Sequence, residues 1–163
     1  METDRLNEAA LRAAADDLAR RDARLGAVVA QYGAPPLWAR EPGFPTLLHI
    51  ILEQQVSLAS ARAAFDRLLA AADPLTPAGF LELDDAALKT IGFSRQKTRY
   101  GRELARAVLS GSLNLEAVHV LEDDAVRSQL TAIPGIGRWT ADIYLLMALG
   151  RPDVWPMGDL ALE

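Results

Sequence analysis

Apolar residues recur at intervals of three or four positions along almost the whole chain, and this spacing restricts the possible folds more than any other feature of the sequence. Residues 61–69 are an example, because their apolar members fall on one face of a helix. No segment alternates between apolar and polar residues with the period of two that a half-buried strand requires. The sequence therefore predicts an all-α protein, and its 163 residues suit one compact domain or two small helical lobes.

Capping residues divide this pattern into separate helices. Thr46, Ser57, Asp84 and Ser94 each precede an apolar-periodic run, as helix N-cap residues do. The expected helices span residues 4–18, 22–31, 46–54, 57–71, 84–90, 94–111, 123–130 and 138–149, and a further helix is expected to begin at Leu160.

Glycine and proline mark the connections between the expected helices. Residues 33–45 are rich in proline and predict a boundary between N-terminal helices, residues 1–43, and a core unit, residues 44–163. Within the core unit, Asp73-Pro74 and Thr76-Pro77 are typical of turns.

Composition and charge exclude several classes of function. The absence of cysteine excludes disulfides, thiolate metal sites and iron–sulfur clusters. The apolar runs are too short to cross a bilayer and the chain starts with acidic rather than basic residues, so we expect a cytoplasmic protein without membrane contact. A net charge of −5 argues against holding nucleic acid by bulk electrostatics, although five cations within twelve residues leave a local basic face. These cations are Arg95, Lys97, Arg99, Arg102 and Arg106.

A glycine loop lies between the expected helices 123–130 and 138–149, in the segment L-T-A-I-P-G-I-G-R-W-T-A over residues 130–141. Gly135 and Gly137 lack a Cβ, and we expect both to adopt positive φ and to let a ligand approach the backbone closely. Pro134 stiffens the start of the loop, and the apolar run that follows predicts a helix N-terminus directly after it. Such a loop is typical of an anion site, but glycine turns between helices are also common without any ligand.

This loop resembles part of a known family when it is taken together with the segment W-P-M-G-D-L over residues 155–160. The family is the helix-hairpin-helix DNA glycosylases, and the most similar branch is 3-methyladenine DNA glycosylase II. Residues 50–57 and 91–97 agree with it, so that the resemblance covers roughly residues 44–163. It implies the fold of these glycosylases, in which an active-site cleft lies between two helical lobes. Relatives continue with further helices, so we expect either that C-terminal helices are missing beyond Glu163 or that this protein closes its pocket in another way.

The resemblance implies that Asp159 is the catalyst. A carboxylate there would stabilise the positive charge that the sugar gains as the glycosidic bond breaks, and would align or deprotonate the attacking water. One unit-charge pair about 4 Å apart at an effective dielectric near 20 is worth about 4 kcal/mol, so a single carboxylate is sufficient to matter. The alternative role for Asp159 is the N-cap of a following helix, and both roles are compatible.

Three aromatic residues are candidates for the pocket that receives the base. Trp139, on the first turn of the hairpin helix, would form the wall, because its electron-rich face attracts a methylated, positively charged purine. Its alternative role is that of a core tryptophan between helices. Tyr144 and Trp155 are weaker candidates, and core packing is the favoured interpretation of both.

The resemblance also implies the contacts with DNA. The hairpin residues Pro134, Gly135, Ile136, Gly137 and Arg138 would form the phosphate site, with the backbone N–H groups after Pro134 as donors, and carbonyls of Thr131, Ile133 and Ile136 would coordinate a monovalent cation, Na⁺ or K⁺. The turn at Gln54-Gln55 matches the family's position for the side chain that fills the gap left in the duplex. The complete set of further DNA-contact candidates is Gln54, Gln55, Ser57, Arg95 and Lys97.

Two functions remain open at this point. The first is a monofunctional glycosylase that needs no cofactor, acts as a monomer and releases alkylated purines from double-stranded DNA. Strand-cutting members carry a Schiff-base lysine where this chain has Trp139, and the only lysines are Lys89 and Lys97. The second is a non-catalytic helix-hairpin-helix module that binds DNA structure, which would not require Asp159. A helical scaffold for protein interactions is a third, weaker alternative.

Other polar residues have structural interpretations. His49 and Glu53 lie four positions apart on one helical face, but two potential ligands without a third do not make a metal site. Asp142 is expected to serve helix packing or to face solvent.

Overall fold

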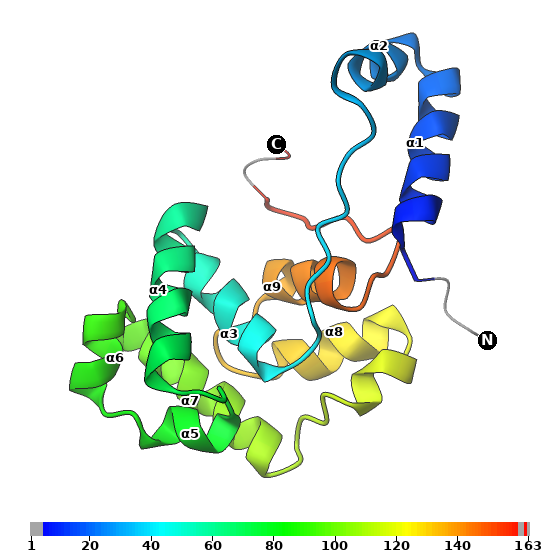
Figure 1. Ribbon diagram of the computed structural model, residues 1–163. Helices are drawn as coiled ribbons and strands as arrows, with labels where there is room; N and C mark the ends of the chain where they lie inside the picture. Colours follow the sequence, from blue (N-terminus) through cyan, green and yellow to red (C-terminus); the bar gives the residue numbers. More distant parts are fainter. Residues whose placement is uncertain (1–4, 160–161, 163) are drawn as a thin grey trace.

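The computed structural model describes residues 5–159 and 162 (Figure 1). The regular structure within these residues is entirely helical, as the sequence predicts. No helix in this part of the chain is long and apolar enough to cross a membrane. In chain order the elements are α1 (Glu8–Arg21), α2 (Ala23–Tyr32), α3 (Phe44–Glu53), α4 (Leu58–Ala71), α5 (Pro77–Glu82), α6 (Asp85–Ile91), α7 (Arg95–Leu109), the 3₁₀ turn η1 (Ala117–Val120), α8 (Asp123–Thr131), α9 (Arg138–Ile143) and the π-helical turn η2 (Tyr144–Ala148).

Three of the predicted N-caps are confirmed. Ser57, Asp84 and Ser94 each accept a hydrogen bond from the backbone N–H three residues later, at the start of α4, α6 and α7 respectively. These bonds satisfy N–H groups that have no partner within the helix. Local sequence therefore determines where these helices begin.

The predicted cap at Thr46 is wrong. Helix α3 begins at Phe44 after Gly43, and Pro45 occupies its first turn. A proline is well suited to this position because its missing N–H would have no intrahelical partner there. The Thr46 hydroxyl instead donates to the carbonyl of Glu41, 2.5 Å away.

Helix α5 and the 3₁₀ turn η1 were not expected from the sequence. The Thr76-Pro77 pair, interpreted as a turn, is the start of α5: Thr76 caps it by accepting a hydrogen bond from Gly79 N, and Pro77 opens it. A threonine followed by proline is the signal that identifies this helix.

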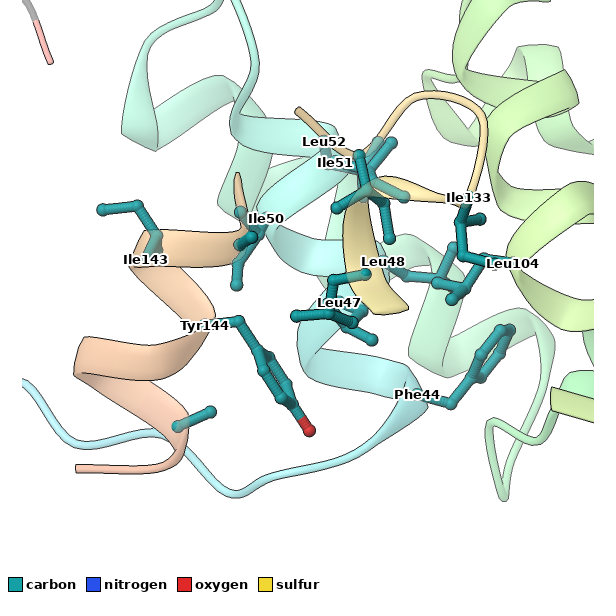
Figure 2. Packing of buried hydrophobic residues seen from close by; sticks show 14 of the residues in the cluster. Phe44, Leu47, Leu48, Ile50, Ile51, Leu52, Leu104, Ile133, Ile143 and Tyr144 are labelled. Carbon is teal, nitrogen blue, oxygen red and sulfur yellow. The ribbon is translucent and has the colours of Figure 1, made fainter. Parts of the chain in front are cut away.

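Helix α3 is the centre of the core. Its residues Leu47, Leu48, Ile50, Ile51 and Leu52 are all buried, which is the pattern of a helix covered on every side. Figure 2 shows several of these side chains packed together with residues from later helices. Helix α3 is in contact with α4, α7, α9 and the turn η2. It therefore fixes the positions of these elements relative to one another.

Helices α1 and α2 form a hairpin that lies apart from the main body of the structure (Figure 1). Among the described residues, the main core cluster contains none that precedes Phe44. Two backbone hydrogen bonds attach the flanking segments to the body: Leu6 N donates to Gly150 O at 2.7 Å, and Arg40 N donates to Met147 O at 2.8 Å. The division at residue 43 into two units stays a prediction.

The helix predicted over residues 138–149 is present but is not regular. Helix α9 passes into η2, where Leu149 N donates to Tyr144 O five residues earlier, 3.0 Å away. Such π-helical turns are frequent near functional sites. The chain then leaves as a loop that carries Asp159, and the helix predicted to start at Leu160 lies outside the described residues.

Candidate active site and DNA-binding hairpin

The loop between α8 and α9 is a tight hairpin held from inside by two buried isoleucines. Ile133 and Ile136 are at most 9% exposed, and Ile136 N donates to Ile133 O at 3.0 Å. Gly135, between them, has a φ of +91°, and a Cβ on it would collide with the ring of Tyr100 from α7. Only glycine fits this position, for conformational and steric reasons together.

Gly137 has a different role from the one predicted. Its φ is −87° and its ψ is 178°, an extended conformation that any residue adopts, so the expectation of positive φ at this glycine is wrong. A Cβ on Gly137 would meet no other atom within 4 Å. The missing side chain therefore leaves open space at the point where α9 begins.

The N-terminus of α9 has no side-chain cap. The first N–H groups of a helix have no acceptor within it, and they carry the positive end of the helix dipole. Together with the open space at Gly137, this arrangement suits an incoming anion such as a backbone phosphate. The phosphate contact itself stays a prediction.

Gln54 and Gln55 lie in the turn that follows α3. Gln54, at the end of α3, donates from Nε2 to Gly135 O at 2.9 Å and to Thr140 Oγ1 at 3.0 Å. Gln55 follows with a φ of +58° and is exposed. Of the two predicted gap-filling candidates, Gln54 thus faces the protein and Gln55 faces solvent.

The remaining predicted DNA contacts lie in different environments. Arg95 and Arg138 are exposed, and Ser57 is exposed while capping α4. Lys97 is half-buried and donates from Nζ to the carbonyl of Leu52 at 2.7 Å. Burial lowers the pKa of Lys97. Lys97 is thus already engaged with the end of α3, whereas Arg95 and Arg138 present their charge to solvent.

The proposed catalyst meets the first turn of α9. The indole Nε1 of Trp139 donates to Oδ2 of Asp159 at 3.1 Å. Both residues are partly exposed, and Trp139 also packs against the main core. Because an indole N–H can only donate, this bond orients the carboxylate toward the edge of the ring. Residues twenty positions apart in sequence thus form one site.

The two weaker aromatic candidates have opposite environments. Tyr144 is fully buried, and its hydroxyl oxygen accepts a hydrogen bond from Gly43 N at 3.0 Å. Burial raises the pKa of Tyr144. Core packing is therefore confirmed for Tyr144, which does not line an open pocket. Trp155 is 62% exposed, so core packing is the wrong interpretation of this residue.

The carbonyls predicted to coordinate a cation belong to Thr131, Ile133 and Ile136. Thr131 ends α8, where carbonyls lack intrahelical donors, and Ile133 O accepts one hydrogen bond and retains a second lone pair. Neutral carbonyl oxygens of this kind fit a monovalent cation such as Na⁺ or K⁺. The cation stays a prediction.

Asp142 joins the two helices of the hairpin. It is fully buried, and Arg127 Nε from α8 donates to its Oδ1 at 2.6 Å. The hydrogen bond to Asp142 is the main reason why the pKa of Arg127 is raised above its usual value. Arg138 lies 3.6 Å from Oδ2 of Asp142. The interpretation of Asp142 as a residue of helix packing is therefore confirmed.

His49 and Glu53 are structural, as expected. Arg40 donates two hydrogen bonds to Glu53, at 2.8 and 2.9 Å, and the His49 ring stacks on Phe65 with 4.3 Å between centroids. No group of three or more His, Cys, Asp or Glu residues that could hold a metal occurs in the described part of the chain.

Two shallow surface hollows lie away from Trp139 and Asp159. Each is lined by charged side chains. One is formed by Glu122, Asp123, Asp124, Arg127, Arg151, Pro152 and Asp153, and the other by Asp85, Arg95, Thr98, Arg99, Arg102 and Arg106. Several of these arginines are neutralised locally; Arg102, for example, lies 2.6 Å from Asp85. The predicted cleft between two lobes is not among these hollows and stays a prediction.

The comparison with protein families identifies the chain. Residues 48–163 match the HhH-GPD superfamily of base excision DNA repair proteins. The chain belongs to this family. The matched region includes the hairpin and Asp159, which the structure brings together through Trp139.

Known relatives within the family agree in sequence and in structure. DNA-3-methyladenine glycosylase 1 of Schizosaccharomyces pombe is 29% identical over 144 residues, which cover 86% of this chain and 63% of that protein. The S. pombe 3-methyladenine DNA glycosylase in complex with abasic DNA superimposes with a TM-score of 0.85 at 28% identity, covering 91% of this chain and 76% of that one. A DNA-3-methyladenine glycosidase from Bacillus halodurans gives a TM-score of 0.74 at 32% identity, with coverage of 99% and 72%.

The chain spans only part of its curated relatives. It covers 63% of the length of the S. pombe enzyme and 51% of a second relative, from Bacillus subtilis. The helix-hairpin-helix glycosylase fold is established by the family match over residues 48–163 and by the superposition, which covers 91% of this chain.

Proposed function

We propose that this protein is a monofunctional DNA glycosylase that hydrolyses the N-glycosidic bond of alkylated purines in double-stranded DNA. The observation that carries the proposal is the hydrogen bond from Trp139 to Asp159, which places a carboxylate beside an aromatic ring at the first turn of the hairpin helix. Membership of a base excision repair family supports the reaction class. The names of the relatives support 3-methyladenine, and with it 7-methylguanine, as substrates.

Binding begins at the hairpin. A base within a duplex is inaccessible to a hydrolytic site, so its nucleotide must be turned out of the helix. The uncapped N–H groups at the start of α9 hold a phosphate of the lesion strand through main-chain dipoles. This contact requires no lysine, which explains how a chain of net charge −5 binds DNA.

The extruded base stacks on Trp139. An alkylated purine such as 7-methylguanine carries a positive charge, and the face of an indole attracts a cation by about 0.5–2 kcal/mol, depending on how far the contact is desolvated. The edge of the same indole donates a hydrogen bond to Asp159. Trp139 therefore contacts both the base and the catalytic carboxylate. Trp139 thus selects the base with its face and positions the catalyst with its edge.

Asp159 acts on the sugar. As the bond from C1′ to the base nitrogen breaks, its electron pair leaves with the base, and the carboxylate stabilises the positive charge that develops at C1′. Water adds to C1′ and gives up a proton to Asp159, leaving an abasic site and the free base. The glycosidic bond of a cationic base is already weak, so protonation of the leaving group is unnecessary. One carboxylate is sufficient for this chemistry.

The reaction stops at the abasic site. Strand cleavage in this family requires a lysine amine that attacks the sugar, and Trp139 occupies the corresponding position. Of the two lysines in the sequence, Lys97 is engaged with the carbonyl of Leu52 and Lys89 lies on α6. No cofactor is required, and a Na⁺ or K⁺ at the hairpin carbonyls would serve to offset the phosphate charge.

The hairpin, Trp139 and Asp159 all come from one chain, which supports action as a monomer. The substrate is chromosomal DNA, and the site of action is the cytoplasm, at the nucleoid or its equivalent. Family membership supports this location through the repair role.

Base release from methylated duplex DNA, followed by alkaline cleavage of the abasic product, tests the proposal. We expect the unmodified chain to give alkali-sensitive sites at methylated purines and the Asp159→Asn variant to give few. Direct strand cutting without alkali would contradict a monofunctional mechanism. Tight duplex binding with no base release from either protein would favour the alternative, a non-catalytic clamp for DNA structure.

A further inference from the structure

The side chain of Gln54 connects the turn between α3 and α4 to both sides of the hairpin. Its Nε2 donates to Gly135 O, at the hairpin tip, and to Thr140 Oγ1, on the first turn of α9. A carbonyl oxygen can only accept, so the orientation of the amide is fixed by this pair of bonds. Gln54 is half-buried, and its amide is thereby committed to the protein rather than to solvent.

Neighbouring contacts make this junction rigid. Lys97 donates to Leu52 O at the end of α3, and the ring of Tyr100 occupies the space beside Gly135 that a Cβ would fill. The hairpin tip is thus packed against the start of α7 and tied to the end of α3. Gln54 is the described side chain that bonds the α3–α4 turn directly to the hairpin.

Gln55 is held in an uncommon conformation beside this junction. Its φ is +58°, a conformation that is unfavourable for a non-glycine residue and persists only where the surroundings impose it. Gln54 is anchored on one side, and Ser57 caps α4 on the other. The turn therefore presents the exposed Gln55 at a fixed position relative to the hairpin.

We propose that Gln54 is a positioning residue that holds the α3–α4 turn in register with the hairpin, so that Gln55 enters the duplex at the nucleotide whose phosphate the hairpin binds. This inference rests on the proposed function, because an extruded nucleotide leaves the gap that Gln55 fills. Its consequence is specific: Gln54 supports extrusion of the base and has no part in breaking the bond.

The substitution Gln54→Glu tests the proposal with almost no change of shape. It removes both donated bonds and places a carboxylate against the Gly135 carbonyl. Single-turnover excision of 7-methylguanine is measured from a fully paired duplex and from a single-nucleotide bulge, where extrusion is easier. We expect the rate to fall about tenfold or more on paired DNA and less than about threefold on the bulge.

The matched control is Gln31→Glu, the same charge change on the exposed surface of α2, and it should leave both rates unchanged. Equal losses by Gln54→Glu on paired and bulged DNA would overturn the proposal, as would no loss on either. If Gln54→Glu does not fold, the pair Thr140→Val and Thr140→Ser replaces it, because only valine removes the hydroxyl that accepts from Gln54.

A second readout does not depend on cleavage. The fluorescence of 2-aminopurine placed opposite the lesion rises when a side chain enters the duplex and unstacks it. We expect Gln54→Glu and Gln55→Ala each to lower this signal, and the double variant to be no worse than Gln55→Ala alone. A signal unchanged by Gln54→Glu would overturn the proposal. A chain that shows this Gln54-dependent signal but releases no base would instead overturn the glycosylase function and leave the role of Gln54 intact.

Discussion

The indole nitrogen of Trp139 lies 3.1 Å from Oδ2 of Asp159 and donates a hydrogen bond to it. This bond connects the first turn of α9 to the loop that follows η2, across an interval of twenty residues. Trp139 therefore has two separable contributions, the orientation of Asp159 through its edge and the binding of a base through its face. Variants at the two residues distinguish these contributions.

Asp159→Asn is expected to lower base excision by about two to four decades, because a neutral amide cannot stabilise the charge on the sugar. Affinity for lesion DNA should stay within about tenfold, since the charge acts mainly in the transition state. Single-turnover rates and equilibrium binding to a lesion duplex measure the two quantities. Losses of rate and binding by the same factor would indicate that Asp159 acts by folding or capping.

Trp139→Ala is expected to lose more rate on 7-methylguanine than on hypoxanthine. The first base is cationic and the second neutral, so the difference should be about 0.5–2 kcal/mol, the range of a cation–π contact from exposed to desolvated. Single-turnover excision of both bases from the same duplex sequence measures this difference, because it separates excision from slow product release.

Trp139→Phe is the matched variant for the same test. Phenylalanine keeps a stacking surface but has a weaker quadrupole and no N–H, so the bond to Asp159 is lost. Loss of that bond should slow excision of charged and neutral bases by the same factor, and the weaker ring should add a smaller loss on the charged base alone. Identical losses on both bases in both variants would leave Trp139 as a wall that only fills space.

The two hairpin glycines are expected to respond differently to substitution. Gly137→Val should fold normally, because its backbone is extended and a Cβ meets open space, but it should weaken binding to damaged and undamaged duplexes alike. Gly135→Ala should destabilise the fold, because its φ is +91° and Tyr100 occupies the position of the Cβ. Thermal unfolding and duplex affinity measure the two effects. Normal binding by a folded Gly137→Val variant would show that the hairpin is not the DNA anchor.

The sequence predicts the fold well where local chemistry determines it. The N-caps Ser57, Asp84 and Ser94 form bonds within their own first turn, so the start of each helix is decided by a few neighbouring residues. The predicted start of α3 is wrong because Thr46 bonds to a carbonyl of the preceding connector, a choice that the local pattern does not contain.

The site is predictable in its parts but not in its contacts. Asp159 and Trp139 are identified through a resemblance to a family, while the hydrogen bond between them joins segments that only the folded chain brings together. The same holds for Gln54, whose partners Gly135 and Thr140 are more than eighty residues away. The prediction of positive φ for Gly137 is wrong. The sequence alone does not reveal whether a glycine is present because the backbone has positive φ or because a side chain would fill a space that is open in the structure.

The two partly buried histidines, His49 and His119, are expected to make stability depend on pH. Burial lowers the pKa of His49, assisted by Arg40 and Arg62 and opposed by Glu53 and Asp66. Burial, Arg5 and Arg151 lower the pKa of His119. The unfolded chain therefore binds protons near pH 6.5 that the folded chain does not bind until the pH is lower, so that stability falls as the pH decreases through this range.

Thermal unfolding midpoints between about pH 7.5 and pH 5.5 measure this effect, because the ordinary pKa of histidine lies within that range. The midpoint should fall on acidification, and the double variant His49→Gln with His119→Gln should show a flatter dependence. A double variant that keeps the full slope would assign the pH dependence to carboxylates instead.

The ion pair between partly exposed Arg127 and buried Asp142 is expected to determine how well α8 and α9 hold the hairpin. Arg127 Nε lies 2.6 Å from Asp142, whose side chain is 1% exposed, and the same arginine also bonds Asp124 at 2.8 Å. Arg127→Met leaves the buried carboxylate of Asp142 without the hydrogen bond from Arg127, and leaving a buried charge without its partner costs about 3–5 kcal/mol. Replacing both residues by apolar ones of similar volume, Arg127→Met with Asp142→Leu, should recover most of that loss, because both desolvation penalties disappear together.

Urea unfolding of Arg127→Met, of Asp142→Leu and of the double variant measures the coupling between Arg127 and Asp142. If Arg127 and Asp142 act only by holding α8 and α9 together, the double variant should regain duplex affinity as well as stability. The reason is that the phosphate site uses backbone groups of α9 and neither of these two charged side chains. A double variant that is stable but still binds DNA weakly would show that the charges themselves contribute to binding. A loss below about 1 kcal/mol for Arg127→Met would contradict the importance of this pair, because it would match the contribution of an exposed ion pair.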